Sequence, residues 1–581
     1  MFSKILIANR GEIAVRVIRA ARALGVATVA VHSTPDVGAK HVRDADEAVD
    51  LGGGPATENY LDGAAVIAAA LATGAEAIHP GYGFLSENAA FARSVEDAGL
   101  VFIGPPSTAI AAMGEKVAAR ALAVSAGVPL APGSAGPIID ADAVIAFGAE
   151  HGYPLLVKAS HGGGGRGMRE VENADSAAEA FAGAVREATA AFGNGEVYVE
   201  RYLTAARHVE VQVFADTHGK VLYLGDRDCS VQRRHQKLIE EAPAPGLSDR
   251  LRADMGEAAT RLARQVCYVG AGTVEFMVEG DKYYFLEMNT RIQVEHPVTE
   301  ESLGLDLVVE QIRVAAGEPL SIAHSAPPVT AVSMEARINA EDVADGLFLP
   351  SPGLITLLDA PAGDGIRWDA GYESGDEVQP YYDSLVGKLI ATGPDRETAR
   401  TRLVAALDRL VIDGVSTTIP AARIVLTHPD FVAVEQTTLW LEQKVDFAAP
   451  EEEELAREEV IVGGRYYLIP RFPDAPVTGG AAVAEAPDAE MRSPRGRAAS
   501  TRAGAASDGS VRSPMQGTII QVDAVVGQRV SKGDKLFMLE AMKMENPVTA
   551  PGDGVVDSVG VAVGDSVPSK TVLATLILDA A

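Results

Sequence analysis

Cysteine is scarce in this sequence: Cys229 and Cys267 are the only two among 581 residues. Two thiols cannot build a disulfide framework, and this pair lacks the spacing of a zinc site. The scarcity favours a reducing compartment, so we expect a cytoplasmic protein.

Positive charge is also scarce, with 50 lysines and arginines against 80 aspartates and glutamates and a formal net charge of −30. A general binder of nucleic acid or of anionic membranes would need a basic face. Long hydrophobic runs are missing too. Arg10 and Glu12 interrupt even the N-terminal stretch MFSKILIANRGEIAVRVIRA, so we do not expect a signal peptide there. We expect a soluble protein with neither nucleic acid nor a membrane as a partner.

The length implies several domains, because one hydrophobic core rarely grows beyond about 250–300 residues. KILIANRGEIAVRVIRAARALGVATVAVHS has the pattern of a strand, a glycine turn, a helix and a strand, with Ile13 and Val17 at helical spacing. It opens a βαβ-type region. Later stretches such as HVEVQVFAD and KYYFLEMN have alternating apolar and polar residues, which predicts an antiparallel sheet.

Residues 473–510 have almost no aromatic or β-branched runs, which predicts a flexible linker.

The tail after this linker contains an internal repeat with an offset of 37 residues. PMQGTIIQV at 514–522 matches PGDGVVDSV at 551–559. Two similar sets of short strands predict a quasi-symmetric β-sandwich. EAMKME at 540–545 lies between the halves, at an expected hairpin tip. Its Lys543 is either presented for covalent modification or part of an ordinary surface turn.

A glycine-rich stretch follows a predicted strand in VKASHGGGGRGM, residues 157–168. Backbone N–H groups of such a loop can approach phosphates without obstruction by Cβ atoms. The alternative is a turn with no ligand, and no Walker-type Gly-Lys-Ser/Thr sequence follows.

Two neighbouring predicted strands carry acidic and amide side chains. Glu275 lies in GTVEFMVEG, and Glu287 and Asn289 lie in YYFLEMN. Alternation places Glu287 and Asn289 on one face, with Met288 pointing inward. The set suits Mg²⁺ or Mn²⁺ shared with nucleotide phosphates, although paired carboxylates also occur on solvated sheet faces.

The next stretch, TRIQVEHPVTE, carries a cation, an amide and a carboxylate. We expect Arg291, Gln293 and Glu295 to alternate to one side, where the first two could hold a small planar anion and the third could take its proton. A cross-strand ladder of ion pairs is the alternative. Upstream, CSVQRRHQK concentrates positive charge and predicts an anion site in so acidic a chain, formed by Arg233, Arg234, His235 and Lys237.

The tail resembles a biotin carboxyl carrier, or biotinyl, domain, on the evidence of EAMKM, the preceding SPMQGT and the repeated β module. The resemblance implies that a biotin protein ligase attaches biotin to Lys543 and recognises the flanking methionines. Lipoyl domains match less well. Lys570 departs from the repeat, because Gly533 stands at the matching position of the first half.

Residues 1–446 resemble biotin carboxylases of the ATP-grasp type. The motifs follow in order: IANRGEIA, HPGYGFLSEN, GGGGRGM, RDCSVQRRHQK, FLEMNTRIQVEHPVTE, EARINAED and YYDSLVGKLI. The implied fold is a multidomain α/β and α+β protein with an all-β, lipoyl-like sandwich. The expected parts are a βαβ N-terminal (pre-ATP-grasp) domain (1–112), an ATP-grasp domain with the glycine lid (113–325), a carboxylase C-terminal domain (326–446), a short docking element (447–472), the linker (473–510) and the carrier (511–579).

This resemblance implies a nucleotide site. The ATP phosphates are expected to be held by two lysines and the lid: Lys116, Lys158, Gly163, Gly164, Gly165 and Gly167. The other nucleotide-binding residues, the first two beside the adenine, are expected to be Glu200, Leu203, His208, Gln232 and His235. The metal, Mg²⁺ or Mn²⁺, is expected on Glu275, Glu287 and Asn289, the two glutamates also belonging to the ATP set.

The resemblance also implies how bicarbonate and biotin are bound. Bicarbonate is expected to lie against Arg291, Gln293 and Val294, with Glu295 as its base. Lys237 is expected to steady the transferred phosphate. Arg337 is expected to stabilise the biotin enolate, so that the catalytic set is Arg291, Glu295, Lys237 and Arg337. Tyr82, and with it Asp383, is expected near biotin.

The implied function is ATP- and bicarbonate-dependent carboxylation of biotin on the chain's own carrier domain, as in the short actinobacterial type of acyl-CoA carboxylase α-subunit. About 65 residues separate position 446 from the carrier, too few for a carboxyltransferase domain. Carboxybiotin is therefore expected to pass to a separate carboxyltransferase β-subunit that carboxylates acyl-CoA of the acetyl- and propionyl-CoA class, in an α/β complex with contacts between α-subunits. The alternative is the biotin-carboxylating subunit of a split pyruvate or other 2-oxoacid carboxylase. EEVIVGGRYYLIPRF is expected to be a hairpin that either docks the β-subunit or packs on the chain itself.

Overall fold

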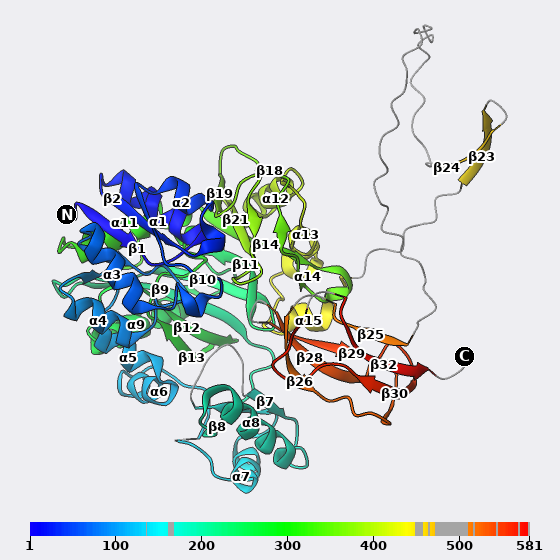
Figure 1. The fold of residues 1–581 in the computed structure, drawn as a ribbon. Helices are drawn as coiled ribbons and strands as arrows, with labels where there is room; N and C mark the ends of the chain where they lie inside the picture. Colours follow the sequence, from blue (N-terminus) through cyan, green and yellow to red (C-terminus); the bar gives the residue numbers. More distant parts are fainter. Residues whose placement is uncertain are drawn as a thin grey trace, which may run out of the picture. The chain divides into compact units, whose positions relative to one another are not determined.

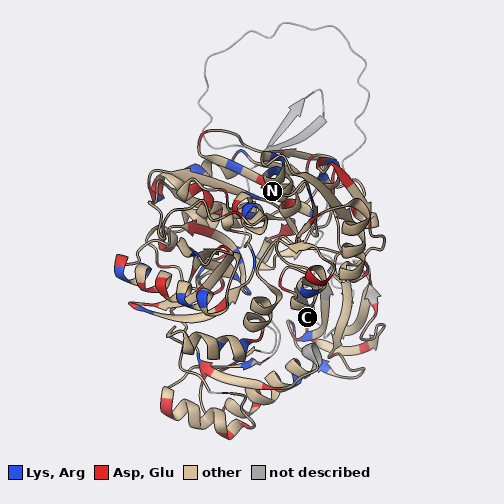
Figure 2. Ribbon diagram, turned by 90° about the vertical axis from the view of Figure 1, so that its left-hand side faces the viewer, with Lys and Arg blue, Asp and Glu red and all other residues tan. Residues whose placement is uncertain are grey.

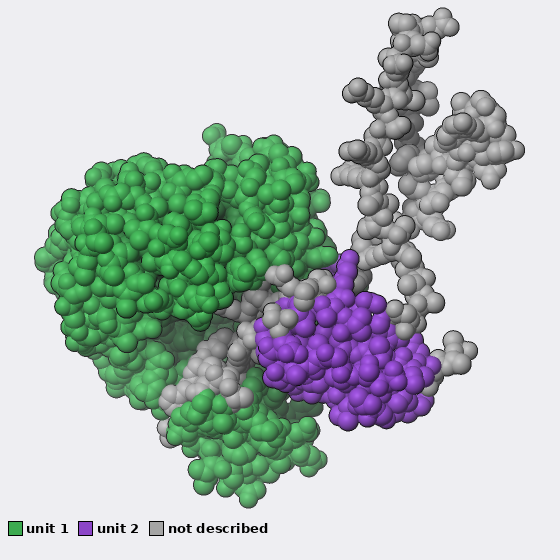
Figure 3. All heavy atoms as spheres, in the orientation of Figure 1, with its two compact units in different colours: residues 1–343, 347–446 green, residues 344–346, 447–581 purple. Residues whose placement is uncertain are grey.

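The computed structural model describes most of the chain, which divides into two compact units, residues 1–343 with 347–446, and residues 344–346 with 447–581 (Figure 3). The glycine lid, residues 473–508 of the predicted linker and Lys543 lie outside the described residues, whereas Ser510, the last residue of the predicted linker, belongs to a strand of the carrier. The described residues are 1–134, 136–160, 168–447, 457–462, 465–470, 509–514, 517–541, 544–567 and 570–578.

The first unit begins with a parallel sheet, in the strand order β3-β2-β1-β4-β5 (Figure 1). The predicted strand–turn–helix–strand pattern is confirmed, because helix α1 (Gly11–Ala23) connects the first two strands and buries Ile13 and Val17. The strands are β1 (Lys4–Ile7), β2 (Ala27–His32), β3 (Glu47–Asp50), β4 (Ala77–His79) and β5 (Val101–Phe102). The helices around them are α2 (Lys40–Asp44), α3 (Gly63–Thr73), α4 (Ala89–Asp97), α5 (Ser107–Gly114) and α6 (Lys116–Ser125).

A large antiparallel sheet forms the centre of this unit, as the alternating strands predicted. Its order is β13-β12-β9-β10-β11-β14-β21-β19, so strands from the middle of the chain continue directly into strands from beyond residue 330. The strands are β9 (Arg207–Ala215), β10 (Val221–Arg233), β11 (Gln236–Ala242), β12 (Gly270–Glu279), β13 (Lys282–Asn289), β14 (Val332–Asn339), β19 (Ile366–Ala370) and β21 (Leu385–Gly393). Helix α9 (Asp249–Gln265) packs on it through a continuous apolar face.

A smaller three-stranded sheet, β7-β6-β8, forms a separate lobe of the same unit (Figure 1). Its core is built from alanines and valines of the strands and helices. The elements are α7 (Ala141–His151), β6 (Leu155–Ala159), β7 (Met168–Val171), α8 (Ala177–Phe192) and β8 (Val197–Arg201).

Short elements complete the first unit. The helices are α10 (His296–Leu303), α11 (Leu307–Ala315), α12 (Arg396–Leu407), α13 (Ile419–Thr427), α14 (Pro429–Val432) and α15 (Trp440–Lys444). The strands are β15 (Glu341–Asp342), β16 (Leu349–Pro350), β17 (Gly353–Leu354), β18 (Leu357–Asp359), β20 (Glu377–Val378) and β22 (Val411–Asp413). The 3₁₀ turns of this unit are Thr34–Asp36 and Ala56–Glu58, and a third described turn, Ala344–Gly346, belongs to the second unit.

The second unit contains the predicted β-sandwich, and its strands follow the 37-residue repeat. β26 (Gly517–Val522), β27 (Arg529–Val530) and β28 (Lys535–Ala541) recur as β30 (Gly554–Val559), β31 (Ser566–Val567) and β32 (Val572–Leu578). The two sheets, β25-β32-β30-β27 and β29-β28-β26-β31, are related by the same offset. The first strand of each half is β25 (Ser510–Arg512) or β29 (Met544–Thr549).

Two hairpins predicted from the sequence are present in this unit. β28 and β29 pair antiparallel up to Ala541 opposite Met544, and the two residues between them, Lys543 included, lie outside the described residues. β23 (Arg457–Val462) pairs antiparallel with β24 (Arg465–Pro470) in the proposed docking element.

Acidic and basic residues are interspersed over the elements (Figure 2). Among the described residues, no helix has the length and apolar character needed to cross a membrane.

Candidate active site

A cavity of about 420 Å³ lies in the first unit, bounded by the large sheet, the small lobe and the segment before α15. It gathers most of the residues predicted for ATP, metal and bicarbonate, although they come from positions 116 to 337. Those that line it are Lys116, Lys158, Glu200, Leu203, His208, Gln232, His235, Lys237, Glu275, Glu287, Asn289, Arg291, Gln293, Val294, Glu295 and Arg337. Gly163, Gly164, Gly165 and Gly167 lie outside the described residues.

Lys237 lies at the centre of this cavity among three carboxylates. Its Nζ atom is 2.5 Å from Glu295 Oε1, 2.7 Å from Glu210 Oε2 and 3.2 Å from Glu275 Oε1. Burial lowers the pKa of Lys237, but the Cys229 thiol and the three carboxylates outweigh burial and hold the pKa well above its usual range. Lys237 is therefore a permanent cation placed where a phosphate can meet it.

Glu295 is held between two cations. Arg337 Nη2 donates to its Oε2 atom at 2.9 Å, opposite the Lys237 contact. Burial raises the pKa of Glu295, but Lys237 and Arg337 more than offset burial and hold the pKa well below its usual range. The carboxylate is thus ionised and open to a proton, and its basicity depends on how strongly the two cations stay engaged with it.

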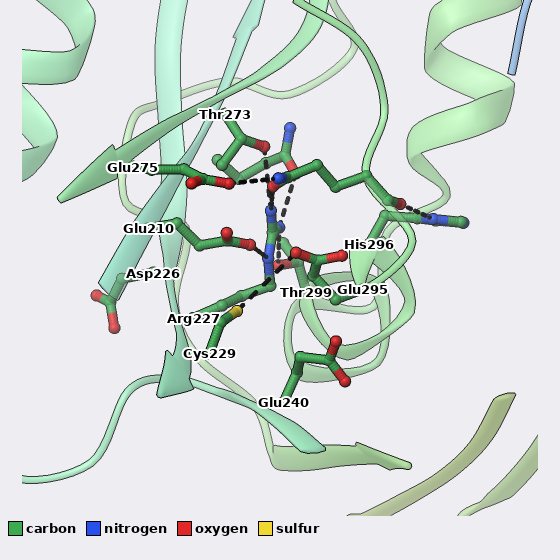
Figure 4. A network of polar contacts seen from close by, with 12 residues as sticks. Glu210, Asp226, Arg227, Cys229, Glu240, Thr273, Glu275, Glu295, His296 and Thr299 are labelled. Atoms are coloured by element: carbon green, nitrogen blue, oxygen red, sulfur yellow. Dashed lines mark hydrogen bonds and ion pairs between the residues drawn. The ribbon is translucent and has the colours of Figure 1, made fainter. Parts of the chain in front are cut away.

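Arg227 is the centre of a buried polar network that sequence reasoning missed, and Figure 4 shows it among Glu210, Thr273 and Thr299. Its Nε atom donates to Glu210 Oε1 at 2.5 Å, and its Nη2 atom donates to Gln293 Oε1 at 2.9 Å. Its other three contacts are Nη1 to Gln212 Oε1 (2.7 Å), Nη1 to Thr299 Oγ1 (2.9 Å) and Nη2 to Thr273 Oγ1 (3.1 Å). The sequence of β10 offers no periodic signal for Arg227, because it lies between Asp226 and Asp228 in a consecutive run of polar residues.

Glu275 and Glu287 lie directly opposite each other on β12 and β13, as predicted, while Met288 is buried in the core. Oε1 of Glu275 accepts from Asn289 Nδ2 at 2.8 Å, and Oε2 lies 3.0 Å from His208 Nε2. Within the described part of the chain, the carboxylate of Glu287, unlike that of Glu275, has no hydrogen-bond or ion-pair partner. Burial raises the pKa of Glu287, and the charge of Glu275 adds to this effect.

The side chains of Glu275, Glu287 and Asn289 fit a divalent cation. Two facing carboxylates in one cavity repel each other, and a bound Mg²⁺ or Mn²⁺ would remove that cost. Oxygen ligands are what both ions prefer.

A second group of charges lies at the small lobe. The ammonium group of Lys158 forms an ion pair with Glu200, and Arg120 Nη1 donates to the other Glu200 oxygen at 3.1 Å. Lys116 begins α6, and burial lowers its pKa while the Glu287 charge opposes this effect. Two lysines from different elements therefore converge on one side of the cavity, as a polyphosphate would require.

The prediction that Arg291, Gln293 and Glu295 alternate along a strand is wrong. Strand β13 ends at Asn289, and the chain then turns into α10. The three side chains nevertheless line the cavity together. Arg291 is held by Glu87, with its Nε atom 2.9 Å from Glu87 Oε2.

Tyr82 and Asp383 do not line the cavity as the structure describes it. The Tyr82 hydroxyl donates to Glu12 Oε2 at 2.5 Å, and Asp383 Oδ1 accepts from the backbone N–H of Leu385 at 3.2 Å. Arg337, predicted for biotin together with Tyr82, does line it and also donates to Glu240 Oε1 at 2.6 Å. The biotin site therefore remains a prediction.

Sequence reasoning also missed lining residues from the segment that precedes α15. Thr438 and Leu439 line the cavity, although they belong to the end of the first unit. No local pattern distinguishes these two residues from other helix-flanking positions.

Comparison with protein-family models accounts for nearly all of the first unit and for the carrier. Residues 1–110 match the model described as biotin carboxylase, N-terminal domain, and residues 335–443 match the biotin carboxylase C-terminal domain. Residues 115–323 match the carbamoyl-phosphate synthase L chain, ATP binding domain. Residues 509–576 match the biotin-requiring enzyme model.

Similar sequences extend over the whole chain. The chain is 45% identical over 591 residues to the biotin-dependent acyl-coenzyme A carboxylase alpha3 subunit of Mycobacterium leprae, covering 99% of this chain and 98% of that protein. A biotin carboxylase of Haemophilus influenzae is 51% identical over 446 residues, which are 77% of this chain and 99% of that protein.

Solved structures match the first unit. The biotin carboxylase domain of the Hydrogenobacter thermophilus 2-oxoglutarate carboxylase, a dimer in complex with MgADP, ADP and bicarbonate, has a TM-score of 0.73 and 46% identity. The match covers 76% of this chain and 98% of that one. A Campylobacter jejuni biotin carboxylase with an ATP analogue gives a TM-score of 0.74 and 42% identity over 76% and 99% of the two chains.

Proposed function

Since the chain belongs to the family of biotin-dependent acyl-CoA carboxylase α-subunits, in which a biotin carboxylase is fused to a biotinyl carrier, we propose that it carboxylates biotin on its own Lys543 and passes the carboxyl group to a separate carboxyltransferase β-subunit. That partner would carboxylate acyl-CoA of the acetyl- and propionyl-CoA class. The observation that carries the proposal is the convergence of Glu295, Lys237 and Arg337 in one cavity with the facing carboxylates Glu275 and Glu287.

The first step needs ATP and bicarbonate side by side. Lys116 and Lys158 would hold the phosphates, and closure of the glycine lid would exclude water from the unstable intermediate. Glu275, Glu287 and Asn289 would hold Mg²⁺ or Mn²⁺, which neutralises phosphate charge when it is bound. Arg291, Gln293 and the Val294 backbone would orient bicarbonate for attack on the γ-phosphorus.

Glu295 would accept the bicarbonate proton as the phosphorus–oxygen bond forms and ADP leaves. In the structure its basicity is suppressed by Lys237 and Arg337. Because an incoming phosphate competes for the Lys237 ammonium group, ATP binding would raise the pKa of Glu295 and make it a better base. Lys237 would at the same time stabilise charge on the migrating phosphoryl group.

The second step uses biotin as the acceptor substrate. Carboxyphosphate would release CO₂ to the ureido nitrogen, and the phosphate would leave with the ureido proton. Arg337, already directed at Glu295, would offset negative charge on the ureido oxygen. Tyr82 is proposed to contact biotin from the rim.

The whole-length match to the M. leprae α3 subunit supports acyl-CoA as the final acceptor, because the 2-oxoglutarate carboxylase structure matches only the carboxylase part of the chain. A biotin protein ligase for Lys543 and contacts between α-subunits belong to the same proposal. The hairpin β23–β24 is proposed to dock the β-subunit.

Two measurements test this function. ADP formation by the full chain should require bicarbonate and should rise with free biotin; absence of bicarbonate-dependent turnover would reject the carboxylase step. Capture on streptavidin followed by mass spectrometry of the copurified subunit should identify an acyl-CoA carboxyltransferase, whereas a metal-dependent 2-oxoacid carboxyltransferase would reject the acyl-CoA assignment.

A further inference from the structure

Lys388 is a fully buried lysine behind the cavity, and the catalytic scheme does not use it. It lies on β21 opposite Arg337 of β14, and its side chain has 0% exposure. Its Nζ atom donates to the backbone carbonyl of Val294 at 2.7 Å. An ammonium group is costly to bury without partners, so its position needs an explanation beyond packing.

Glu12 supplies the counter-charge from the start of α1. Its Oε1 atom lies 3.1 Å from Lys388 Nζ, and its side chain is 1% exposed. Asp369, which faces Lys388 across β19 and β21, is instead bound by Arg367 at 2.6 Å and by Arg19 at 2.8 Å. Glu12 is thus the carboxylate that pairs with Lys388.

The same glutamate holds Tyr82 with its second oxygen. The Tyr82 hydroxyl donates to Glu12 Oε2 at 2.5 Å. A continuous chain of contacts therefore runs from the Tyr82 hydroxyl through Glu12 and Lys388 to the Val294 carbonyl. It joins the N-terminal sheet region, the central sheet and the proposed bicarbonate loop.

Backbone geometry shows what Lys388 does for this loop. The carbonyl and the N–H of one trans peptide unit point in opposite directions. Lys388 fixes the Val294 carbonyl from behind, and the Nδ1 atom of His296 lies 2.7 Å from the Gln293 carbonyl. The Glu295 N–H, which shares a peptide unit with the Val294 carbonyl, therefore points away from Lys388. The Val294 N–H, which shares a peptide unit with the Gln293 carbonyl, likewise points away from His296.

The approach of the chain around Glu12 is also tight. A Cβ atom on Gly371 would come within 2.4 Å of the Glu12 backbone nitrogen. Only glycine fits where the loop after β19 crosses the start of α1, so this crossing fixes the base from which Glu12 reaches Lys388.

We propose that Lys388 and Glu12 are positioning residues for biotin carboxylation, which hold the Val294 peptide for bicarbonate and the Tyr82 hydroxyl for biotin in one fixed arrangement. The inference rests on the proposed roles of Val294 and Tyr82. Neither Lys388 nor Glu12 contacts the reacting atoms; both act through the groups that they hold.

The test compares two single variants of the full chain, Lys388→Met and Glu12→Gln, with the double variant. Each single change leaves one buried charge unpaired and should destabilise the first unit, whereas the double change removes both charges and should restore much of the stability. The double variant still lacks the donor to Val294. Its KM for bicarbonate should therefore rise about tenfold, with the KM for ATP unchanged.

A control removes another ion pair of the same unit, between half-buried Arg396 and buried Glu241, whose Nε–Oε2 distance is 2.8 Å. The double variant Arg396→Met/Glu241→Gln should keep the wild-type KM for bicarbonate. Tyr82→Phe should raise the KM for free biotin, because it removes the hydroxyl that Glu12 holds.

The outcomes separate the inference from the proposed function. A folded Glu12→Gln/Lys388→Met variant with a wild-type KM for bicarbonate would overturn the positioning role. A wild-type chain that forms no ADP in response to bicarbonate would instead reject the function on which the inference rests.

Discussion

Replacing Arg227 by methionine should disrupt the buried polar network centred on it (Figure 4). Arg227 and Glu210 form an ion pair with both side chains at 0% exposure. Breaking a buried pair by removing one partner costs about 3–5 kcal/mol, because the remaining charge is left uncompensated. Lys237 still holds the other oxygen of Glu210 at 2.7 Å. We therefore expect the free energy of unfolding to fall by about 3 kcal/mol, near the lower end of that range.

The same change should affect bicarbonate. Arg227 holds Gln293 Oε1, and this contact directs the Gln293 amide nitrogen to Glu275 Oε1 at 2.8 Å. Without the Arg227 guanidinium, the Gln293 amide keeps only one of these two hydrogen bonds, the one to Glu275. A hydrogen bond from a charged donor contributes about 1.5–3 kcal/mol, so the KM for bicarbonate should rise at least about tenfold.

The assay can follow the first unit alone, because both tryptophans, Trp368 and Trp440, belong to it. Denaturant unfolding by tryptophan fluorescence gives the stability loss, and initial rates of ADP formation give the KM for bicarbonate. Arg252→Met is the matched control, because Arg252 pairs with buried Asp226 away from the cavity. It should lose stability and keep the wild-type KM. A folded Arg227→Met chain with unchanged stability and KM would refute the reasoning.

Three further predictions concern other residues. Burial raises the pKa of Glu240 from 4.5 to about 7, so the folded state binds this proton more tightly than the unfolded chain does. The proton therefore stabilises the folded state by about 3 kcal/mol at most; this stabilisation is complete below pH 4.5 and is lost as the pH rises through 7. Glu240→Gln should remove this dependence of the unfolding free energy on pH. Glu287→Gln should weaken Mn²⁺ binding at least about tenfold in a calorimetric titration, and unchanged affinity would contradict the metal assignment. Lys570 has φ = +66°, like Gly533 at +94° in the first half of the repeat, so Lys570→Gly should stabilise the carrier by about 1 kcal/mol, seen as slower amide exchange in β32; faster exchange would count against it.

The sequence carried most of the fold because its signals are local or periodic. Ile13 and Val17 mark the buried face of α1, and the 37-residue repeat anticipates how the strands of the sandwich correspond. The prediction for Arg291 to Glu295 as a strand failed because alternation over five residues is compatible with a loop. Pro297 in the first turn of α10 was the local signal that a helix begins there.

Other site residues could not be predicted, because their role depends on contacts between distant strands. Arg227 meets Glu210 on the neighbouring strand and Gln293 from beyond β13. Glu12 meets Lys388 across more than 370 positions of sequence. Such pairs leave no periodic trace in a single sequence, and only the folded sheet brings them together.

The most direct test follows the carboxyl group itself. The biotinylated full chain, incubated with ATP, Mg²⁺ and labelled bicarbonate, should acquire label on the tryptic peptide that contains Lys543. Lys543→Arg should carry no label and still form ADP with free biotin. Label that appears without ATP, or that persists in the Lys543→Arg chain, would contradict the account.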